Sequence, residues 1–348
     1  MFSADVCLFY IVYELLIGLV FLVMYSTANS RGGVEAILFF AGWAVVGSFL
    51  VGVAAIYIVC CCQACSFRAV STFHFSSDEL YYLYVLLFFG FGTKLSTWPL
   101  WYWLPRAHVE VSTGMSIFLS CILIKICLYA LVRFLTLLHG DLVIIPFIFV
   151  VCLSVFDLTL RLSIQTDLKA ITAYGSVLHV NLLLLLILLD TSVLSTGTLL
   201  YVWGHSYATA GAFFAINLAE RATGSRSTVE NSGLYMINSM TALVCIVAMV
   251  TFLEFPLCFF FWGEFWLWVV LLDSLPLSGL VLMFIGAIIY VMVYFRLWWG
   301  VIFGGMSFLG TVPRLALSFE EAALGVYILG FQFIVGLQPN LLSFYAVN

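Results

Sequence analysis

Charged residues are scarce in this sequence. Only 8% of the 348 residues are Asp, Glu, Lys or Arg, whereas a soluble globular domain has about 25%. So few charges cannot cover the surface of a water-soluble fold of this length. The remainder is 65% hydrophobic with a mean hydropathy of +1.19. The composition therefore predicts an integral membrane protein.

The sequence also lacks the alternation of apolar and polar residues that a membrane β-barrel requires. Only helices and closed barrels can span a bilayer, because its core holds no water to satisfy backbone groups. A barrel strand alternates apolar and polar residues over about 10 positions. Val180–Leu189 is almost continuously apolar instead. We therefore predict an all-α integral membrane fold.

Motifs for bound cofactors are also missing. The sequence has no glycine-rich phosphate loop after a strand, no nucleophile elbow, and only five His, which is few for haem sites between helices. Its ten Cys are scattered except over positions 60–65, and a metal or disulfide site needs more ligands at defined spacing. We interpret them as small apolar side chains. We expect no cofactor and no metal.

Ten stretches are long and apolar enough to span a bilayer, which takes about 20 residues. Two of them carry a residue that disrupts a helix. Pro99 ends the third stretch, which also contains Lys94, and Pro256 lies inside the eighth. The predicted spans are 5–27, 35–60, 79–98, 114–138, 142–160, 170–189, 192–218, 233–270, 275–299 and 318–337.

The distribution of Lys and Arg favours one interrupted span over two separate spans in 233–270. Basic residues collect in loops on the cytoplasmic or matrix side. With one span, eight of the 12 basic residues fall on one side and two on the other, and Lys94 and Lys125 lie within the membrane. With two spans the split is six against four. The first residue is then predicted to lie on the external side.

Six ionisable residues fall near the middle of six different spans. A charge at that depth costs several kcal/mol, so such residues usually face a polar interior. Each has an alternative structural role, as an ion-pair partner or a hydrogen-bonded core histidine. Together, however, they form a row across the protein whose ordinary pKa values lie on both sides of neutrality, which suits a proton relay. They are Glu14, Lys94, Lys125, His179, His205 and Glu264, with Asp157 and Glu254 as less central cases.

Five segments carry recognisable motifs, of which the first two are the most specific. They are Lys94–Pro99 with Trp103–Glu110, Gln165–Lys169 with Ala173–His179, the helix of His205, Gly263–Phe265 and Gly336–Asn340. In sequence, order and spacing, these motifs resemble those of the NADH dehydrogenase subunit 4 family, whose members are antiporter-like membrane subunits of respiratory complex I. The similarity extends along the whole chain.

The resemblance implies an antiporter-like bundle with inverted five-helix repeats, each with one broken helix. It places an incomplete first repeat at 1–140, a second repeat at 141–299, and a C-terminal helix and tail at 300–348. It makes Glu14 and Lys94 the key pair of the first repeat and Lys125 the connector. His179, His205 and Glu264 are then the relay of the second repeat.

The resemblance also implies a function and partners. The expected function is proton translocation in the membrane arm of NADH:ubiquinone oxidoreductase, in the mitochondrial inner membrane, with no redox centre in this chain. Expected partners are other membrane-arm subunits, including neighbouring antiporter-like subunits, and lipids, but no nucleic acid. Glu14 matches the family's fifth helix, so we expect a separate chain to supply four preceding helices, unless this lineage has lost them.

Two alternatives stay open. One is a subunit of a multi-subunit cation/proton antiporter, whose family shares these residues. The sequence of Trp103–Glu110, WLPRAHVE, resembles the mitochondrial form of the motif and argues against this alternative. The other is a structural membrane-arm subunit without transport. Retention of Lys94, Lys125 and Glu264 argues against that reading, because a scaffold gains nothing from their burial. Val111–Gly114 departs from the family motif "APIAG".

Overall fold

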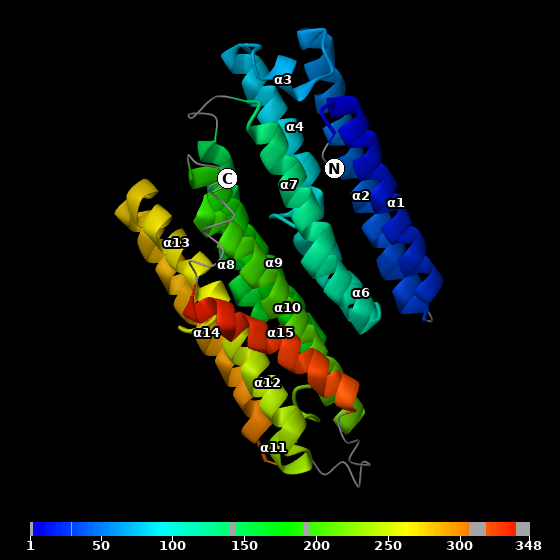
Figure 1. The fold of residues 1–348 in the computed structure, drawn as a ribbon, viewed down its shortest axis with the longest axis vertical. Coiled ribbons are helices and arrows are strands. Elements are labelled where there is room, and N and C mark those ends of the chain that lie inside the picture. The colour runs from blue at the N-terminus through cyan, green and yellow to red at the C-terminus, as the bar shows by residue number, and fades with distance from the viewer. Residues whose placement is uncertain (1–2, 29, 139–143, 191–194, 306–317, 339–348) are drawn as a thin grey trace. The chain divides into compact units, whose positions relative to one another are not determined.

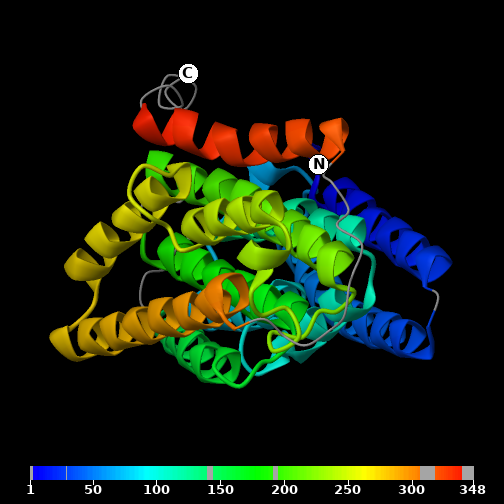
Figure 2. The same cartoon turned by 90° about the horizontal axis from the view of Figure 1, so that it is seen from below.

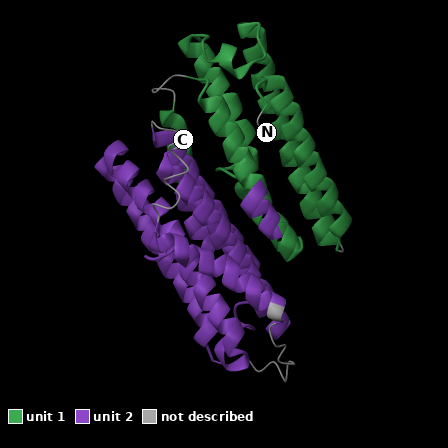
Figure 3. Ribbon diagram, viewed as in Figure 1, with its two compact units in different colours: residues 1–115, 123–154 green, residues 116–122, 155–348 purple. Residues whose placement is uncertain are grey.

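Helices form all the named elements of the described residues. The computed structural model describes residues 3–28, 30–138, 144–190, 195–305 and 318–338 (Figure 1). The chain divides into two compact units (Figure 3). Unit 1 comprises residues 1–115 and 123–154, and unit 2 comprises residues 116–122 and 155–348. The division into repeats at 140 and 299 concerns internal symmetry and stays a prediction.

Unit 1 is built around two long helices and the first interrupted helix. The second helix, α2, packs along α4, α1 and α5. Helix α7 also packs against α4. The helices of unit 1 are α1 (Val6–Thr27), α2 (Arg31–Cys62), α3 (Phe67–Val70), α4 (Ser77–Leu95), the 3-10 turn η1 (Leu100–Tyr102), α5 (Trp103–Glu110), the start of α6 (Thr113–Phe118), α7 (Ile124–Leu135) and the first half of α8 (Ile145–Leu162).

Unit 2 is built around α10, which packs against α9, α12, α13 and α15. Helix α15 lies along one side of unit 2, where it packs against α10, α12 and α13 (Figure 2). A π-helical turn, η2 (Leu119–Leu123), separates α6 from α7 along the chain. The remaining helices are α9 (Leu168–Leu189), α10 (Thr196–Thr223), α11 (Leu234–Ile237), α12 (Ser239–Phe252), α13 (Phe259–Ser274), α14 (Leu277–Phe303) and α15 (Phe319–Leu337).

Seven helices within the described ranges are long and apolar enough to span a membrane. They coincide with seven of the ten predicted spans. The other three predicted spans are helical too, but they correspond to the more polar α4 and α10 and to the short pair α12 and α13. The helices α12 and α13 fall short in length and not in apolar character, because they have 14 and 16 residues. The helices α4 and α10 are long enough but carry more polar residues, among them Lys94 and His205. The all-α membrane fold is confirmed.

Both predicted interruptions are present. In the first, α4 ends at Leu95, Ser96 has a left-handed backbone (φ 60°), and the helix resumes at η1. Its second half continues through α5 to Glu110, beyond the predicted end at residue 98. In the second, α12 and α13 have 14 and 16 residues, each short of the ~20 that a full span needs. One interrupted span, rather than two, therefore lies in 233–270.

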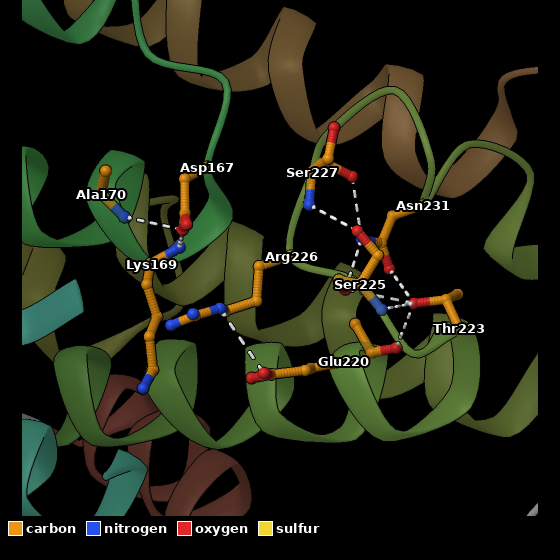
Figure 4. A network of polar contacts seen from close by, with 10 residues as sticks. Asp167, Lys169, Ala170, Glu220, Thr223, Ser225, Arg226, Ser227 and Asn231 are labelled. Carbon is orange, nitrogen blue, oxygen red and sulfur yellow. Dashed lines mark hydrogen bonds and ion pairs between the residues drawn. The ribbon is translucent and has the colours of Figure 1, made fainter. Parts of the chain in front are cut away.

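A polar network ties the start of α9 to the end of α10 (Figure 4). Asp167 caps α9 by accepting hydrogen bonds from the backbone N–H groups of Lys169 (2.7 Å) and Ala170 (3.3 Å). The N–H of Leu168 then donates to the carbonyl of Arg226, 3.0 Å away, in the loop after α10. The cap explains Asp167 of the Gln165–Lys169 motif, because a side-chain oxygen satisfies otherwise unpaired N–H groups at a helix start.

The loop after α10 is held by one buried amide. Asn231 donates to the carbonyls of Ser225 (2.8 Å) and Ser227 (2.9 Å), and it accepts from the hydroxyl of Thr223 (2.6 Å). Its side chain is fully buried, so each of these bonds is costly to lose. The network fixes the register of α9 against α10, the two helices that carry His179 and His205.

Candidate functional site

Glu14 and Lys94 form a buried ion pair in unit 1. Lys94 Nζ lies 3.1 Å from Glu14 Oε1 and 2.9 Å from the hydroxyl oxygen of Ser48. Ser48 also donates to the other carboxylate oxygen of Glu14. The three residues come from α4, α1 and α2. The Lys94 side chain is 5% exposed and that of Glu14 is 26% exposed, so the lysine is the more deeply buried partner.

Close packing and an aromatic ring complete the surroundings of Lys94. A Cβ at Gly47 would meet the carbonyl oxygen of Gly90 at 2.6 Å, so only glycine lets α2 approach α4 here. That approach brings the adjacent Ser48 to Lys94. The ammonium also lies 4.4 Å from the ring centre of Tyr13, a favourable cation–π geometry. The hydroxyl of Tyr13 donates to the thiol of Cys127, 3.2 Å away.

Lys125 lies on α7, directly after the π-helical turn η2 and two residues before Cys127. Its side chain is half-buried. Single π-helical turns within α-helices occur frequently at functional sites. Lys125 belongs to unit 1, and the predicted link from it to His179 stays a prediction.

His179 is the centre of a second cluster, in unit 2. Its Nδ1 lies 3.1 Å from Glu254 Oε1 and 3.3 Å from the hydroxyl oxygen of Tyr201. Its Nε2 lies 2.9 Å from the hydroxyl oxygen of Tyr290. The side chains of His179 and Glu254 are 1% and 4% exposed. A histidine, a carboxyl group and two phenols thus form a continuous polar cluster inside an apolar bundle.

Glu264 joins this cluster through a cavity. The cavity measures about 30 Å³ and is lined by His179, Glu254, Glu264, Tyr290 and apolar side chains of α8, α9, α13 and α14. That volume has room for roughly two water molecules. Glu264 is less buried than Glu254, and Trp268 Nε1 donates to its Oε1 at 3.1 Å. The two carboxyl groups lie close enough to interact with each other.

His205 lies beside the cluster on α10. Its Nε2 is 3.3 Å from the hydroxyl oxygen of Ser176, and its ring centre is 5.9 Å from that of His179. The ring of Phe260 packs against both histidines. A Cβ at Gly263 would stand 2.5 Å from the Cα of Tyr201. Glycine before Glu264 therefore lets α13 approach α10 closely, so that Glu264 and His205 belong to the same part of the bundle.

The structure groups the predicted residues in two places. Glu14 and Lys94 meet in unit 1, and His179, His205 and Glu264 gather in unit 2. Sequence reasoning treated Glu254 as a lesser case and missed Ser48, Ser176, Tyr201 and Tyr290 altogether. The available signal for Glu254 was its place two residues before Pro256. The uncharged serines and tyrosines gave no such signal, because such residues are common in membrane spans that have no role in transport.

Other candidates have structural roles or none. Asp157 pairs with Arg161 one turn later, at 3.0 Å, and both side chains are partly exposed. Cys62 and Cys65 have the spacing of a CxxC pair, but in the parts of the chain described no group of three or more His, Cys, Asp or Glu could hold a metal. Cys127, Cys245 and Cys258 are buried, whereas Cys7, Cys60 and Cys65 are exposed. The interpretation of the ten cysteines as apolar side chains stays a prediction.

Comparison with known proteins identifies the family. The model described as "NADH:quinone oxidoreductase/Mrp antiporter, TM" matches residues 3–292. The chain belongs to this family. The match covers both clusters, from Glu14 to Glu264, and both interrupted helices.

Two curated relatives with the same name are similar to this chain. The chain is 34% identical over 249 residues to NADH-ubiquinone oxidoreductase chain 4 of Paramecium tetraurelia, covering 72% of this chain and 52% of that protein. It is 26% identical over 332 residues to the protein of the same name from Acanthamoeba castellanii, covering 94% and 66%. The chain thus spans about half to two thirds of the length of these relatives.

Solved structures share the fold. A chain of respiratory complex I from Thermus thermophilus superposes with a TM-score of 0.87 at 18% identity, covering 97% of this chain and 72% of that one. A chain of the Mrp complex from Dietzia sp. gives a TM-score of 0.84 at 17% identity, covering 97% and 72%. The antiporter-like membrane fold is therefore common to both complexes.

Proposed function

We propose that this chain is a proton-translocating membrane-arm subunit of NADH:ubiquinone oxidoreductase, respiratory complex I. It moves protons while other subunits transfer electrons from NADH to ubiquinone. The name of the curated relatives supports complex I over other members of the family. The solved structures do not separate the two, because the identities to the complex I chain and the Mrp chain are 18% and 17%.

One observation carries the transport function: the buried pair of Lys94 and Glu14. An amine that is 5% exposed in a membrane span is expensive unless it is paired. Its position at the end of the interrupted helix α4 supports a moving charge, because broken helices at a site are typical of transporters. When Glu14 withdraws or is neutralised, Lys94 becomes an unpaired buried cation and its proton is released toward Lys125.

The remaining assignments follow from this function. The chain holds no redox centre or cofactor of its own. It lies in the mitochondrial inner membrane as a multi-pass protein, against other membrane-arm subunits and lipid. Large apolar side chains on α1, such as Leu15 (64% exposed) and Leu19 (63% exposed), support such contacts. The expectation of a separate chain beside the first three spans stays a prediction.

The alternative is a subunit of a multi-subunit cation/proton antiporter, and the fold shared with the Mrp chain favours it. The two functions differ in their driving force. Membranes with complex I acidify one side when NADH is added. An antiporter instead exchanges protons for sodium without NADH. Co-purification with NADH-oxidising subunits would support complex I, and sodium-driven proton flux in their absence would support the antiporter.

Lys94→Arg tests the proposal in the assembled enzyme. Arginine keeps the ion pair with Glu14 but does not release its proton at accessible pH. We expect assembly at parental levels and at least a tenfold loss of NADH-driven proton pumping in reconstituted vesicles. Normal pumping by the Lys94→Arg enzyme would remove Lys94 as a proton carrier. A purely structural subunit would show the same result, with pumping unchanged.

A further inference from the structure

The predicted row runs from His179 to Glu264, but the structure places another carboxyl group between them. Glu254 touches Nδ1 of His179 at 3.1 Å on one side. On its other side, it interacts with Glu264 across the shared cavity. It belongs to the segment that interrupts the helix, between α12 and α13. Its position therefore links two groups that lie on different helices.

We propose that Glu254 is a proton-carrying residue of unit 2 and passes protons between His179 and Glu264. This inference rests on the proposed function and adds a residue to it. The His179–Glu254 step needs no water, since Nδ1 and Oε1 lie 3.1 Å apart. The two atoms are not aligned as a hydrogen bond in this structure, so the step begins with a rotation of the imidazole or the carboxyl group. The Glu254–Glu264 step runs directly or through a water in the cavity of about 30 Å³.

The hydrogen bonds of Tyr290 define the exchanging nitrogen. Its hydroxyl oxygen lies 2.9 Å from Nε2 of His179 and 3.4 Å from the carbonyl oxygen of Phe252. When the phenol donates to that carbonyl, Nε2 keeps its proton and donates to the phenol. Nδ1 is then the nitrogen that gains and loses a proton, and Nδ1 is the atom that faces Glu254.

Each transfer balances without electrons or a co-reactant. The Nδ1–H bond of the His179 imidazolium breaks as an O–H bond forms on the Glu254 carboxylate, which leaves a neutral imidazole and a carboxylic acid. The Glu254 O–H bond then breaks as one forms on the carboxylate of Glu264. Glu264, the less buried of the two carboxyl groups, is the outer member of the pair.

The backbone argues against a purely structural role for Glu254. Its φ is 57°, in the left-handed region where glycine is the default residue. A segment that only interrupted the helix would be served at lower cost by glycine. A carboxyl group at this position adds both backbone strain and the desolvation of a side chain that is 4% exposed. A side chain that acts on His179 and Glu264 accounts for both costs.

Glu254→Gln in the assembled enzyme is the decisive variant. Glutamine has nearly the same shape and keeps an oxygen beside Nδ1 of His179, but its amide does not take up and release a proton at accessible pH. We expect normal assembly and at least a tenfold slower NADH-driven proton pumping. Glu254→Asp keeps a carboxyl group and should recover part of the rate. Asp157→Asn, a partly exposed carboxylate outside the cluster, is the matched control. Pumping by Glu254→Gln at the parental rate would overturn the proposal.

Infrared difference spectroscopy decides the point without reference to pumping. A proton-carrying Glu254 contributes a carboxylic acid C=O band that appears and disappears as the pH of the sample is cycled. We expect Glu254→Gln to remove this band and to shift the Glu264 band, and Asp157→Asn to change neither. If the parent enzyme does not pump, the proposed function fails, and the infrared result still stands on its own. A spectrum unchanged by Glu254→Gln would refute the role of Glu254.

Discussion

The two units bury ionisable groups in different ways. In unit 1, Lys94 faces a single carboxylate of opposite charge, and Glu14 is 26% exposed. In unit 2, one imidazole faces two carboxyl groups and two phenols, and His179 and Glu254 are nearly inaccessible. A lysine–carboxylate pair is stable while both groups are charged. An imidazole with two carboxyl groups is stable over several positions of a shared proton.

This difference suits the two clusters to different steps of proton transfer. Moving one partner of the pair in unit 1 leaves a bare charge in a poorly polarisable site, so small movements have large consequences. In unit 2, a proton moved from His179 to Glu254 converts an ion pair into two neutral groups in contact, so neither state leaves an unpaired buried charge. Unit 1 is suited to trigger a transfer, and unit 2 is suited to relay it.

The largest expected effect is that of Glu14→Ala. It removes the only carboxylate that the structure shows against Lys94 and leaves a buried ammonium with Ser48 and the ring of Tyr13. Loss of one partner of a buried pair costs about 3–5 kcal/mol, and the partial exposure of Glu14 should keep the loss near the lower figure. We expect reduced assembly on native gels and no proton pumping.

Glu14→Gln is the control for this variant. Glutamine keeps hydrogen bonds to Ser48 and Lys94 but not the charge. A pair that only joins helices would lose some stability and still pump. A switch would assemble and lose pumping. Assembly and pumping falling in equal proportion in both variants would contradict the switch and, with it, the contrast between the units.

Lys94 and Glu254 mark what the sequence could and could not predict. Lys94 was predictable because a lysine inside an apolar stretch has few explanations other than function. The ten helical stretches and both interruptions followed from hydropathy and from two prolines. Glu254 was treated as a less central case, because its place beside Pro256 does not show whether its side chain points into the bundle or away from it. Only the fold shows that this loop turns inward and points its carboxyl group at His179.

Gly263→Val should have the next largest effect, by separating the helices of the second cluster. A Cβ at residue 263 would stand 2.5 Å from the Cα of Tyr201, in backbone that has no room to yield. Overpacking of this kind costs about 1–3 kcal/mol. We expect a lower melting temperature and slower pumping. Gly300→Ala is the control, because nothing beyond the neighbouring backbone of its own helix lies within 4 Å of its Cβ position. Equal melting temperatures for both variants would contradict close packing of α10 and α13.

Tyr290→Phe should have a moderate effect on unit 2. It removes the hydroxyl 2.9 Å from Nε2 of His179 and leaves that nitrogen without this partner inside the bundle. An unsatisfied buried polar group costs about 1–3 kcal/mol. We expect pumping to fall severalfold, because Nε2 no longer holds its proton and either nitrogen of the ring can exchange.

Tyr13→Phe is the matching change in unit 1. It removes the bond to the Cys127 thiol but keeps the ring 4.4 Å from Lys94 Nζ. Pumping should therefore change little. A larger loss of pumping for Tyr13→Phe than for Tyr290→Phe would contradict the view that a tyrosine hydroxyl directs proton transfer in unit 2 and not in unit 1. Pumping rates of both variants, measured on equal amounts of assembled enzyme, make this comparison.

The smallest expected effect is that of Asp157→Asn. Asp157 lies within a predicted span, as do Glu14 and Glu264, so hydropathy alone makes all three equally good candidates for proton transport. The structure separates it from them: its partner Arg161 is one turn away on the same helix, and the two side chains are 27% and 48% exposed. Exposed pairs at this spacing contribute about 0.3–0.5 kcal/mol. We expect no change in pumping and a shift in melting temperature close to the limit of measurement. A tenfold loss of pumping by Asp157→Asn would show that burial does not distinguish transporting carboxylates from structural ones in this chain. The contrast drawn between the two clusters and the rest of the ionisable residues would then have no physical basis.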